Sequence, residues 1–326
     1  MSGDPLTIGI DIGGTKIAGA VIAPDGSIVA RHRVSTPAAS TDRIMAATAE
    51  LVEGLRAAAA PALVTAVGVA CAAFVDSRRG YVWFAPNLPW QDCELGALLR
   101  ERLGLPVVID NDANAAAWGE YRFGAGRDCD DMVLFTVGTG VGGGCIVDDR
   151  LLHGAFGIGG ELGHIVLDPG GPRCGCGNKG CLEVYASGQA LVRNARELVA
   201  SRAKVAAALR EKCGGDPQAL RGQDVTRLAQ AGDTAALELL DDLGTRLGQG
   251  IASVCAVLDP RLIVIGGGVA AAGDLLIEPA RTSFAKHLTG RGHRPSPQVV
   301  AAQLGNDAGM VGAGALAHQH SSPSVT

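Results

Sequence analysis

The sequence predicts an α/β protein with two lobes, and three observations support this fold class. The chain has 326 residues, which is more than one domain usually holds and few for three. Apolar residues make up 47% of it and aromatic residues only 4%, so aliphatic side chains must build a core of helices packed on sheets. A strand followed by a glycine-rich bend occurs near the N-terminus and again after residue 130. We therefore expect one repeated device, with a nucleotide held between the two lobes.

Apolar runs and turn residues define the elements in order. In the first half we expect strands at 6–11, 17–22 and 27–30, a helix at 41–60, a strand at 65–70, a helix at 94–103 and a strand at 106–110. In the second half we expect strands at 131–137, 145–147 and 151–152, helices at 188–212 and 234–258, strands at 261–265 and 298–303, and a helix at 307–317. The polar tail at 318–326 reads as disordered.

The glycine bends predict a phosphate site. Residues 138–143 match the dinucleotide pattern G-x-G-x-x-G, but that pattern should open a helix, and here it leads into a strand. No bend contains a P-loop. A single bend would more often be a tight hairpin, yet a third one follows at 266–268, and the first adds Asp11, Thr15 and Lys16. An acid, a hydroxyl and an ammonium beside backbone donors suit a metal-bound triphosphate.

A cysteine cluster predicts a metal site. Cys174, Cys176 and Cys181 lie in one short glycine-rich segment, with His164 just upstream, whereas the other six cysteines are scattered. Three soft ligands and an imidazole form a tetrahedral zinc set, and four protein ligands leave no open position. Three free thiols and a core histidine are the alternative. We expect a structural Zn²⁺ that braces the surrounding pocket.

A carboxylate at a strand end is the candidate general base. Asp112 follows the predicted strand at 106–110, and open α/β sheets bind ligands at such carboxyl ends. Phosphoryl transfer to an alcohol needs a carboxylate that accepts the hydroxyl proton. The alternative is that Asp110, Asp112 or Asn114 only caps the following helix.

These segments resemble the ROK family (repressors, open reading frames, kinases), in particular its bacterial ATP-dependent glucokinases. The resemblance is based on residues 11–16, residues 138–144 and the cysteine-rich segment, and it covers nearly the whole chain. It implies an actin-like (ribonuclease H-like) duplicated two-lobed ATPase fold with an interlobe cleft. The implied lobes are residues 1–115 with 306–326, and residues 116–305 with the zinc loop at 164–181.

The resemblance also implies roles for individual residues. It assigns ATP contacts to Asp11, Gly13, Gly14, Thr15, Lys16, Gly138, Thr139, Gly140, Gly142, Gly143, Gly266, Gly267 and Gly268. It assigns sugar contacts to Asn87, Asn111, Asp112, Glu161, His164 and Glu183, and the role of base to Asp112. Mg²⁺ would bridge the phosphates near Asp11. Without the resemblance, a proline-stiffened turn explains Asn87 equally well.

The implied reaction is transfer of the ATP γ-phosphoryl group to a hexose. We expect the hexose to be glucose and the product to be glucose 6-phosphate, as in the first step of glycolysis. The same motifs leave open N-acetylmannosamine, N-acetylglucosamine, fructose or allose as acceptor, polyphosphate as donor, and a non-catalytic sugar sensor. A repressor needs a helix-turn-helix ahead of Asp11, where the sequence has ten residues. The family's proline- or glycine-bearing turn is replaced here by Cys71-Ala72-Ala73, and glycine stands among residues 157–160 where relatives often have alanine.

Composition and sequence patterns indicate which classes of partner and which cellular location to expect. The net charge of −5, the isoelectric point near 5.8 and the absence of a Lys/Arg block argue against nucleic acid. No signal peptide pattern and no long apolar run occur in the sequence. We expect a cytoplasmic homodimer or homotetramer that binds a hexose and ATP and no membrane.

Overall fold

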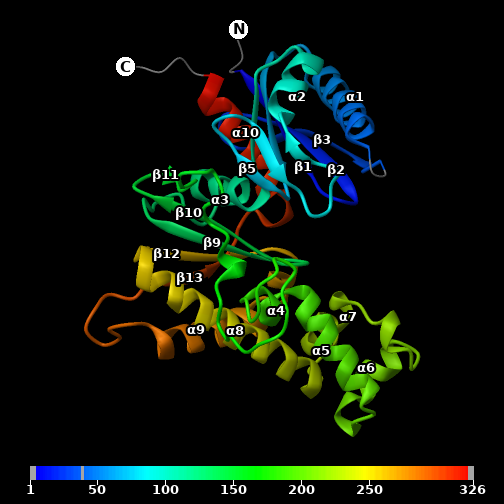
Figure 1. Ribbon diagram of the computed structural model, residues 1–326, viewed down its shortest axis with the longest axis vertical. Coiled ribbons are helices and arrows are strands. Elements are labelled where there is room, and N and C mark those ends of the chain that lie inside the picture. Colours follow the sequence, from blue (N-terminus) through cyan, green and yellow to red (C-terminus); the bar gives the residue numbers. More distant parts are fainter. Residues whose placement is uncertain (1–4, 38–39, 322–326) are drawn as a thin grey trace. The chain divides into compact units, whose positions relative to one another are not determined.

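The computed structural model (Figure 1) describes residues 5–37 and 40–321, and the chain forms two units. The first unit comprises Met1–Asp130, Gly144–Gly160 and Gln303–Thr326, and the second comprises Asp131–Gly143 and Glu161–Ala302. Residues 116–130 and 144–160 thus belong with the N-terminal part of the chain. The lobe boundaries expected at residues 115 and 306 differ from these units and stay a prediction about the functional lobes.

The first unit is built on a five-stranded sheet in the order β3-β2-β1-β4-β8. Its strands are β1 (Leu6–Ile12), β2 (Lys16–Ile22), β3 (Ile28–Ser35), β4 (Val64–Cys71) and β8 (Val107–Asn111). Strands β1 to β3 form an antiparallel meander, while β1, β4 and β8 run parallel. A small second sheet contains β5 (Phe74–Asp76), β6 (Tyr81–Phe84) and β7 (Gln91–Cys93).

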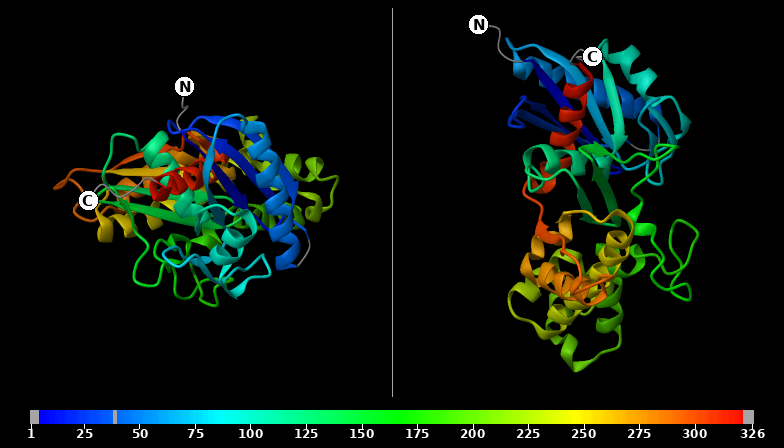
Figure 2. Two further views of the ribbon diagram at one scale, coloured as in Figure 1. Left: turned by 90° about the horizontal axis from the view of Figure 1, so that it is seen from above. Right: turned by 90° about the vertical axis from the view of Figure 1, so that its left-hand side faces the viewer.

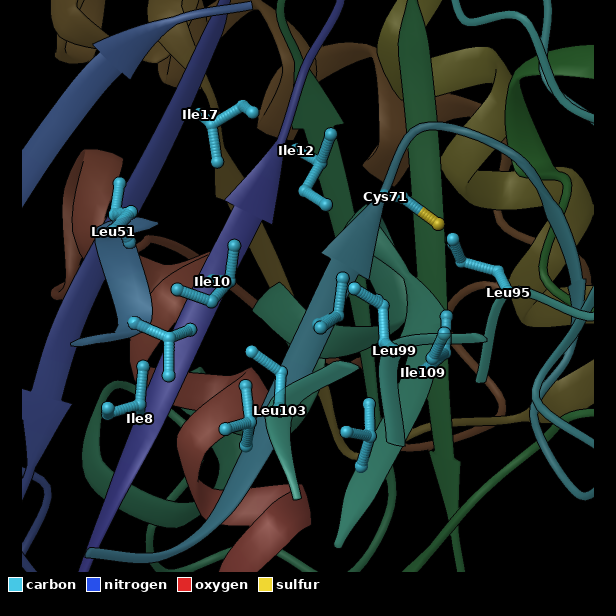
Figure 3. Packing of buried hydrophobic residues seen from close by; sticks show 14 of the residues in the cluster. Ile8, Ile10, Ile12, Ile17, Leu51, Cys71, Leu95, Leu99, Leu103 and Ile109 are labelled. Atoms are coloured by element: carbon cyan, nitrogen blue, oxygen red, sulfur yellow. The ribbon is translucent and has the colours of Figure 1, made fainter. Parts of the chain in front are cut away.

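Helices cover both faces of the first sheet. On one face, Ile8 and Ile10 of β1 pack with Leu51 of α1 (Thr41–Ala59) and Leu99 of α2 (Leu95–Leu103) in one buried cluster (Figure 3). Side chains alternate along a strand, so Gly9 points to the other face. There α10 (Ala308–Ser321) lies against β1 and β4 (Figure 2) and also packs on α3 (Asp112–Phe123).

Close approach of α10 depends on glycines in the strands. A Cβ atom added to Gly68 of β4 would overlap the backbone carbonyl of Ala313. Because backbone atoms cannot swing aside as a side chain can, Gly68→Ala is expected to lower the free energy of unfolding by about 3 kcal/mol. Gly54→Ala, in the exposed interior of α1 where no atom would be met, is the control and should raise stability by about 0.5 kcal/mol. Urea unfolding of both variants tests this, and equal stability of the two would contradict it.

The second sheet repeats the order of the first. It reads β11-β10-β9-β12-β13, with an antiparallel hairpin at one end and three parallel strands, β9, β12 and β13, at the other. Its strands are β9 (Met132–Val137), β10 (Val141–Val147), β11 (Arg150–Leu151), β12 (Leu262–Gly266) and β13 (Gln298–Ala301). This repetition confirms the expected duplicated, actin-like α/β fold.

The helices of the second unit centre on the long α8, which packs along α9 (Figures 1 and 2). They are α4 (Glu183–Ala186), α5 (Gly188–Ala200), α6 (Ala207–Lys212), α7 (Gly222–Gln230), α8 (Thr234–Leu258) and α9 (Asp274–His287). Short 3₁₀ turns lie at Leu162–His164, Lys204–Ala206, Pro217–Ala219 and Gly268–Ala272, and in the first unit at Gly305–Asp307. Within the described ranges, no helix combines the length and apolar character that crossing a membrane requires.

Two expected helix boundaries are wrong. The helix expected at 188–212 is two helices, because the chain turns after Ala200 and Arg202 adopts a left-handed conformation with φ 56°. The last helix continues to Ser321, past the expected end at residue 317. The His320 ring contacts the Leu316 carbonyl at 2.9 Å, which supports the last turn. The rest of the expected tail, residues 322–326, lies outside the described residues.

Candidate active site

The parallel strands of the first unit bring carboxylates to one edge of the sheet. Asp11 of β1 is level with Ala70 of β4, which is level with Asp110 of β8. Asp112 follows two residues later, as the first residue of α3. The register therefore gathers acidic side chains at the carboxyl ends of β1 and β8, which flank β4, and open α/β sheets bind ligands at such ends.

The start of α3 positions Asp112. The Asn111 side chain caps the helix by accepting hydrogen bonds from the backbone N–H groups of Ala113 (2.8 Å) and Asn114 (3.2 Å). The cap is therefore neither Asp110, Asp112 nor Asn114, the three residues considered from the sequence. Since Asn111 carries the cap, Asp112 is not needed for it, and its carboxylate accepts one bond from the Ala113 N–H at 3.0 Å.

Asp112 has the electrostatics of a proton acceptor. It is half-buried, and desolvation raises the pKa of its carboxyl, against the opposing effect of the Ala113 N–H. A raised pKa makes a carboxylate a better base towards an alcohol proton. The role of Asp112 as base stays a prediction that this environment favours.

Asp11 is electrostatically linked to Asp112. Burial and then the charge of Asp112 raise the pKa of Asp11 to about 6, while Lys16 opposes the rise. Like charges at close range disfavour ionisation, and a cation beside them restores it. Oxygen ligands of this kind are those that Mg²⁺ prefers, so Asp11 fits the expected place of a phosphate-bound Mg²⁺.

The first glycine bend connects β1 to β2 and is open to solvent. The Gly13 N–H donates to the Lys16 carbonyl at 3.0 Å, and the Gly13 carbonyl accepts a 2.6 Å bond from the Thr36 hydroxyl. Gly14 is exposed, and a Cβ atom there would stand 3.1 Å from both the Cβ and the carbonyl oxygen of Asn87. The structure thus brings a predicted sugar residue, Asn87, next to a predicted phosphate residue.

The second and third bends lie together in the second unit. The carbonyls of Gly138 and Thr139 accept bonds from the first N–H groups of α5, at 2.8 and 3.2 Å. Gly267, with φ 89°, passes so close to Val137 that a Cβ atom would lie 2.6 Å from the Val137 carbonyl oxygen. Gly142 and Gly143 lie within β10 and not in the bend itself. The assignment of these residues to ATP stays a prediction.

Glu183 joins the second bend to the cysteine cluster. Its Oε2 accepts a 3.0 Å bond from the Val141 N–H, and its Oε1 lies 3.7 Å from Cys174 Sγ. Gly140 has no side chain because a Cβ atom there would overlap the Glu183 carboxylate. The family resemblance implies that Glu183 contacts the sugar. The contacts of Glu183 with Val141 and Cys174 cannot be predicted from residue spacing, because they depend on the fold.

The cysteine cluster has the geometry of a tetrahedral metal site. The ligand atoms of His164, Cys174, Cys176 and Cys181 all lie within 4.8 Å of one another. Cys174 Sγ is 3.6 Å from His164 Nδ1, and Cys176 Sγ is 3.7 Å from Cys181 Sγ. Sulfur ligands placed tetrahedrally at about 2.3 Å from zinc are about 3.8 Å apart. The donor set therefore fits Zn²⁺.

The fold of residues 164–181 supports this fit. Bridges at Val166–Cys181 and Arg173–Lys179 close the segment on itself, and Gly177, with φ 97°, allows the tight turn. Burial, followed by hydrogen bonds from the neighbouring sulfurs, raises the pKa of Cys181 to about 12. A divalent cation would displace that proton, since thiolates are the ligands of zinc.

His164 faces the metal site and a predicted sugar residue at once. Its Nδ1 is the atom near Cys174, whereas its Nε2 lies 3.9 Å from Glu161 Oε2. If Nδ1 binds the metal, the tautomer is fixed and Nε2 carries the hydrogen. Glu161 and His164 thus form a pair that can bind hydroxyl groups.

One pair near Asp112 was missed in the sequence. His153 Nε2 lies 2.7 Å from Asp110 Oδ2, and the two residues are 43 positions apart. No local pattern could have signalled this contact, because it joins the loop after β11 to the end of β8.

Comparison with known proteins identifies the family. The chain matches the ROK family over residues 7–320. It is 43% identical to a glucokinase of Streptomyces coelicolor over 96% of this chain and 98% of the relative, and 36% identical to an N-acetylmannosamine kinase of Escherichia fergusonii over 95% and 98%. A crystal structure of a ROK family glucokinase from Streptomyces griseus, in complex with glucose and AMPPNP, matches with a TM-score of 0.88 at 44% identity, over 96% of this chain and 99% of that one. The chain therefore belongs to the ROK family, as its motifs predict.

Proposed function

We propose that this protein is an ATP-dependent hexose kinase that converts glucose to glucose 6-phosphate. Its similarity to glucokinases extends over nearly the full length of both chains. The single observation that carries the chemistry is the half-buried Asp112, with a raised pKa, at a strand edge that it shares with Asp11 and the open bend of residues 13–16. A candidate base, a carboxylate suited to Mg²⁺ and an open glycine bend at one strand edge support the proposal of phosphoryl transfer.

In this proposal Asp112 accepts the proton of the sugar 6-hydroxyl as the bond to phosphorus forms. Asn111 holds Asp112 in place through the helix cap. One N–H of the Asn111 side-chain amide donates to the Ala73 carbonyl at 3.1 Å, and the other N–H binds the sugar. Asn87, Glu161, His164 and Glu183 supply further contacts to hydroxyl groups. Thr15, Thr139 and amides of the three bends hold the phosphates, apart from the N–H groups of Gly13 and Gly138, which are bonded within their bends. Asp11 would hold Mg²⁺, which would neutralise the phosphate charge.

Zinc has a structural role in this proposal. The four ligands His164, Cys174, Cys176 and Cys181 leave no position for substrate. Glu183 touches Cys174, and His164 reaches Glu161. A rigid cluster would therefore fix three predicted sugar residues together, linking metal occupancy to sugar affinity.

The acceptor and donor are tested directly. Purified protein is offered ATP, and separately polyphosphate, with glucose, fructose, allose, N-acetylmannosamine and N-acetylglucosamine, and NMR identifies the phosphorylated carbon. Glucose should give the highest kcat/KM, with phosphate on C6. N-acetylmannosamine is the second candidate, because one relative is a kinase for that sugar. No turnover with any hexose would favour a non-catalytic sensor. The homo-oligomer and the cytoplasmic location stay predictions.

Asn87→Ala should raise the KM for glucose about tenfold, the loss of one or two hydrogen bonds. The KM for ATP should change less, because alanine keeps the Cβ atom beside Gly14, and the loop remains closed by the bond from Ala85 N–H to the Trp90 carbonyl. Gln91→Ala removes an exposed amide from β7, the strand that follows the turn with Asn87, and serves as the control. Steady-state kinetics measure both constants, and an effect on ATP alone would place Asn87 outside the sugar site.

A further inference from the structure

Both oxygen atoms of the buried Asp110 carboxylate have partners, and His153 is one of these partners. The Asp110 side chain is only 3% exposed, and that of His153 is 22% exposed. Oδ2 of Asp110 faces His153 Nε2 at 2.7 Å, while Oδ1 accepts bonds from Asn111 N–H (2.8 Å) and Asn114 Nδ2 (3.0 Å). A buried carboxylate is costly unless a cation and hydrogen bonds compensate it. In its imidazolium form, His153 would supply the cation of this network.

Asp110 holds both residues that frame Asp112. Asn111 precedes Asp112 and caps α3, and Asn114 lies in the first turn of the helix. The Oδ1 atom of Asn114 is buried and has no hydrogen-bond partner among residues 5–37 and 40–321. The orientation of the Asn114 amide therefore depends on its bond to Asp110. If the Asp110 carboxylate lost its contact with His153, the first turn of α3, which carries Asp112, would become less rigid.

The loop that carries His153 is itself held. The Arg78 guanidinium donates to the Gly154 carbonyl at 2.7 Å, and the Trp83 indole donates to the Phe156 carbonyl at 3.4 Å. Gly157, with φ 81°, packs on the backbone of β5. These contacts belong to the first unit, so the loop offers His153 a fixed position against the end of β8.

We propose that His153, in its imidazolium form, is a positioning residue for the base Asp112 and acts through Asp110. The proposal rests on the proposed function, in which Asp112 accepts the hydroxyl proton. His153 touches neither Asp112 nor the reacting atoms in this scheme. It keeps Asp110 ionised and fixed, and Asp110 in turn orders the cap of α3.

The charge of His153 depends on the groups around it. Burial lowers the pKa of His153, but the hydrogen bond and charge of Asp110 outweigh burial and raise it overall; Arg78 opposes the rise and Asp76 adds to it. A histidine whose pKa is raised in the folded state contributes its full stabilisation of that state below its ordinary pKa. This stabilisation is lost as the pH rises through the raised pKa.

The test compares His153→Gln with the wild type across pH, at saturating glucose and ATP. Glutamine keeps a neutral N–H donor for Asp110 but carries no charge. We expect the wild-type kcat to exceed the variant's about tenfold at pH 6, with the ratio falling towards one by about pH 9. The fall of kcat at low pH that protonation of Asp112 causes occurs in both proteins and therefore cancels in the ratio. Asp110→Asn should show a similar loss near neutral pH, and His32→Gln, an exposed histidine of β3, should show none.

A second readout separates positioning from general stability. In an Asp112→Asn background, His153→Gln should lower the residual kcat less than twofold, because there is no base left to position. A ratio that does not change with pH, or an equal fold-loss in both backgrounds, would overturn the role of His153. If Asp112→Asn itself keeps normal kcat, the proposed function fails instead. The two failures are therefore distinguishable.

Discussion

Asp112→Asn is expected to lower kcat about 1,000-fold, the contribution of a positioned general base. The amide matches the carboxylate in shape, and its oxygen can still accept the bond from the Ala113 N–H. Glucose affinity should therefore change less than about threefold. A coupled assay of ADP release measures kcat, and calorimetry measures glucose binding. Near-normal turnover would remove Asp112 as the base.

The pH dependence of kcat gives this variant a second signature. Because burial raises the pKa of Asp112, wild-type kcat should rise with pH as the carboxyl ionises at a pH above the usual aspartate range. The variant has no such group and should lack this limb. Asp42→Asn is the matched control, since Asp42 also lies in the first turn of a helix, is exposed and is outside the predicted site. It should keep both the rate and the pH profile of the wild type.

Cys176→Ser is expected to lose the bound zinc and, with it, thermal stability and glucose affinity. Cys176 is exposed, so the change removes a ligand with little effect on packing. If free zinc stands about a thousandfold above its Kd, the loss is about 4 kcal/mol, or about 10 °C in Tm for a unit of this size. Metal analysis and thermal unfolding measure the two quantities. The KM for glucose should rise because Glu183 contacts Cys174 and Glu161 lies near His164.

The control for this prediction is Cys93→Ser, a half-buried thiol outside the cluster, which should keep zinc and Tm. Chelation of wild-type protein should reproduce the Cys176→Ser phenotype without any mutation. Metal-free wild-type protein with full activity and unchanged Tm would contradict a structural zinc.

The sequence alone determined the features that depend on short-range pattern. Strand and helix periodicity gave the repeated fold, and the helix expected at 234–258 is α8 with the same ends. The metal cluster was predictable because its four ligands lie within residues 164–181, so their spacing alone brings them together. The family motifs added the roles, which stay predictions for individual residues.

Only the tertiary structure decided which side chains meet across the sheet and between loops. It made Asn111 the cap of α3, joined Asp110 to His153 and placed Glu183 between Val141 and Cys174. Strand register and helix packing set these contacts, and neither leaves a local trace in the chain. The environment of the predicted base is determined in the same way, because desolvation and neighbouring charges, not residue type, shift the pKa values of Asp112 and Asp11.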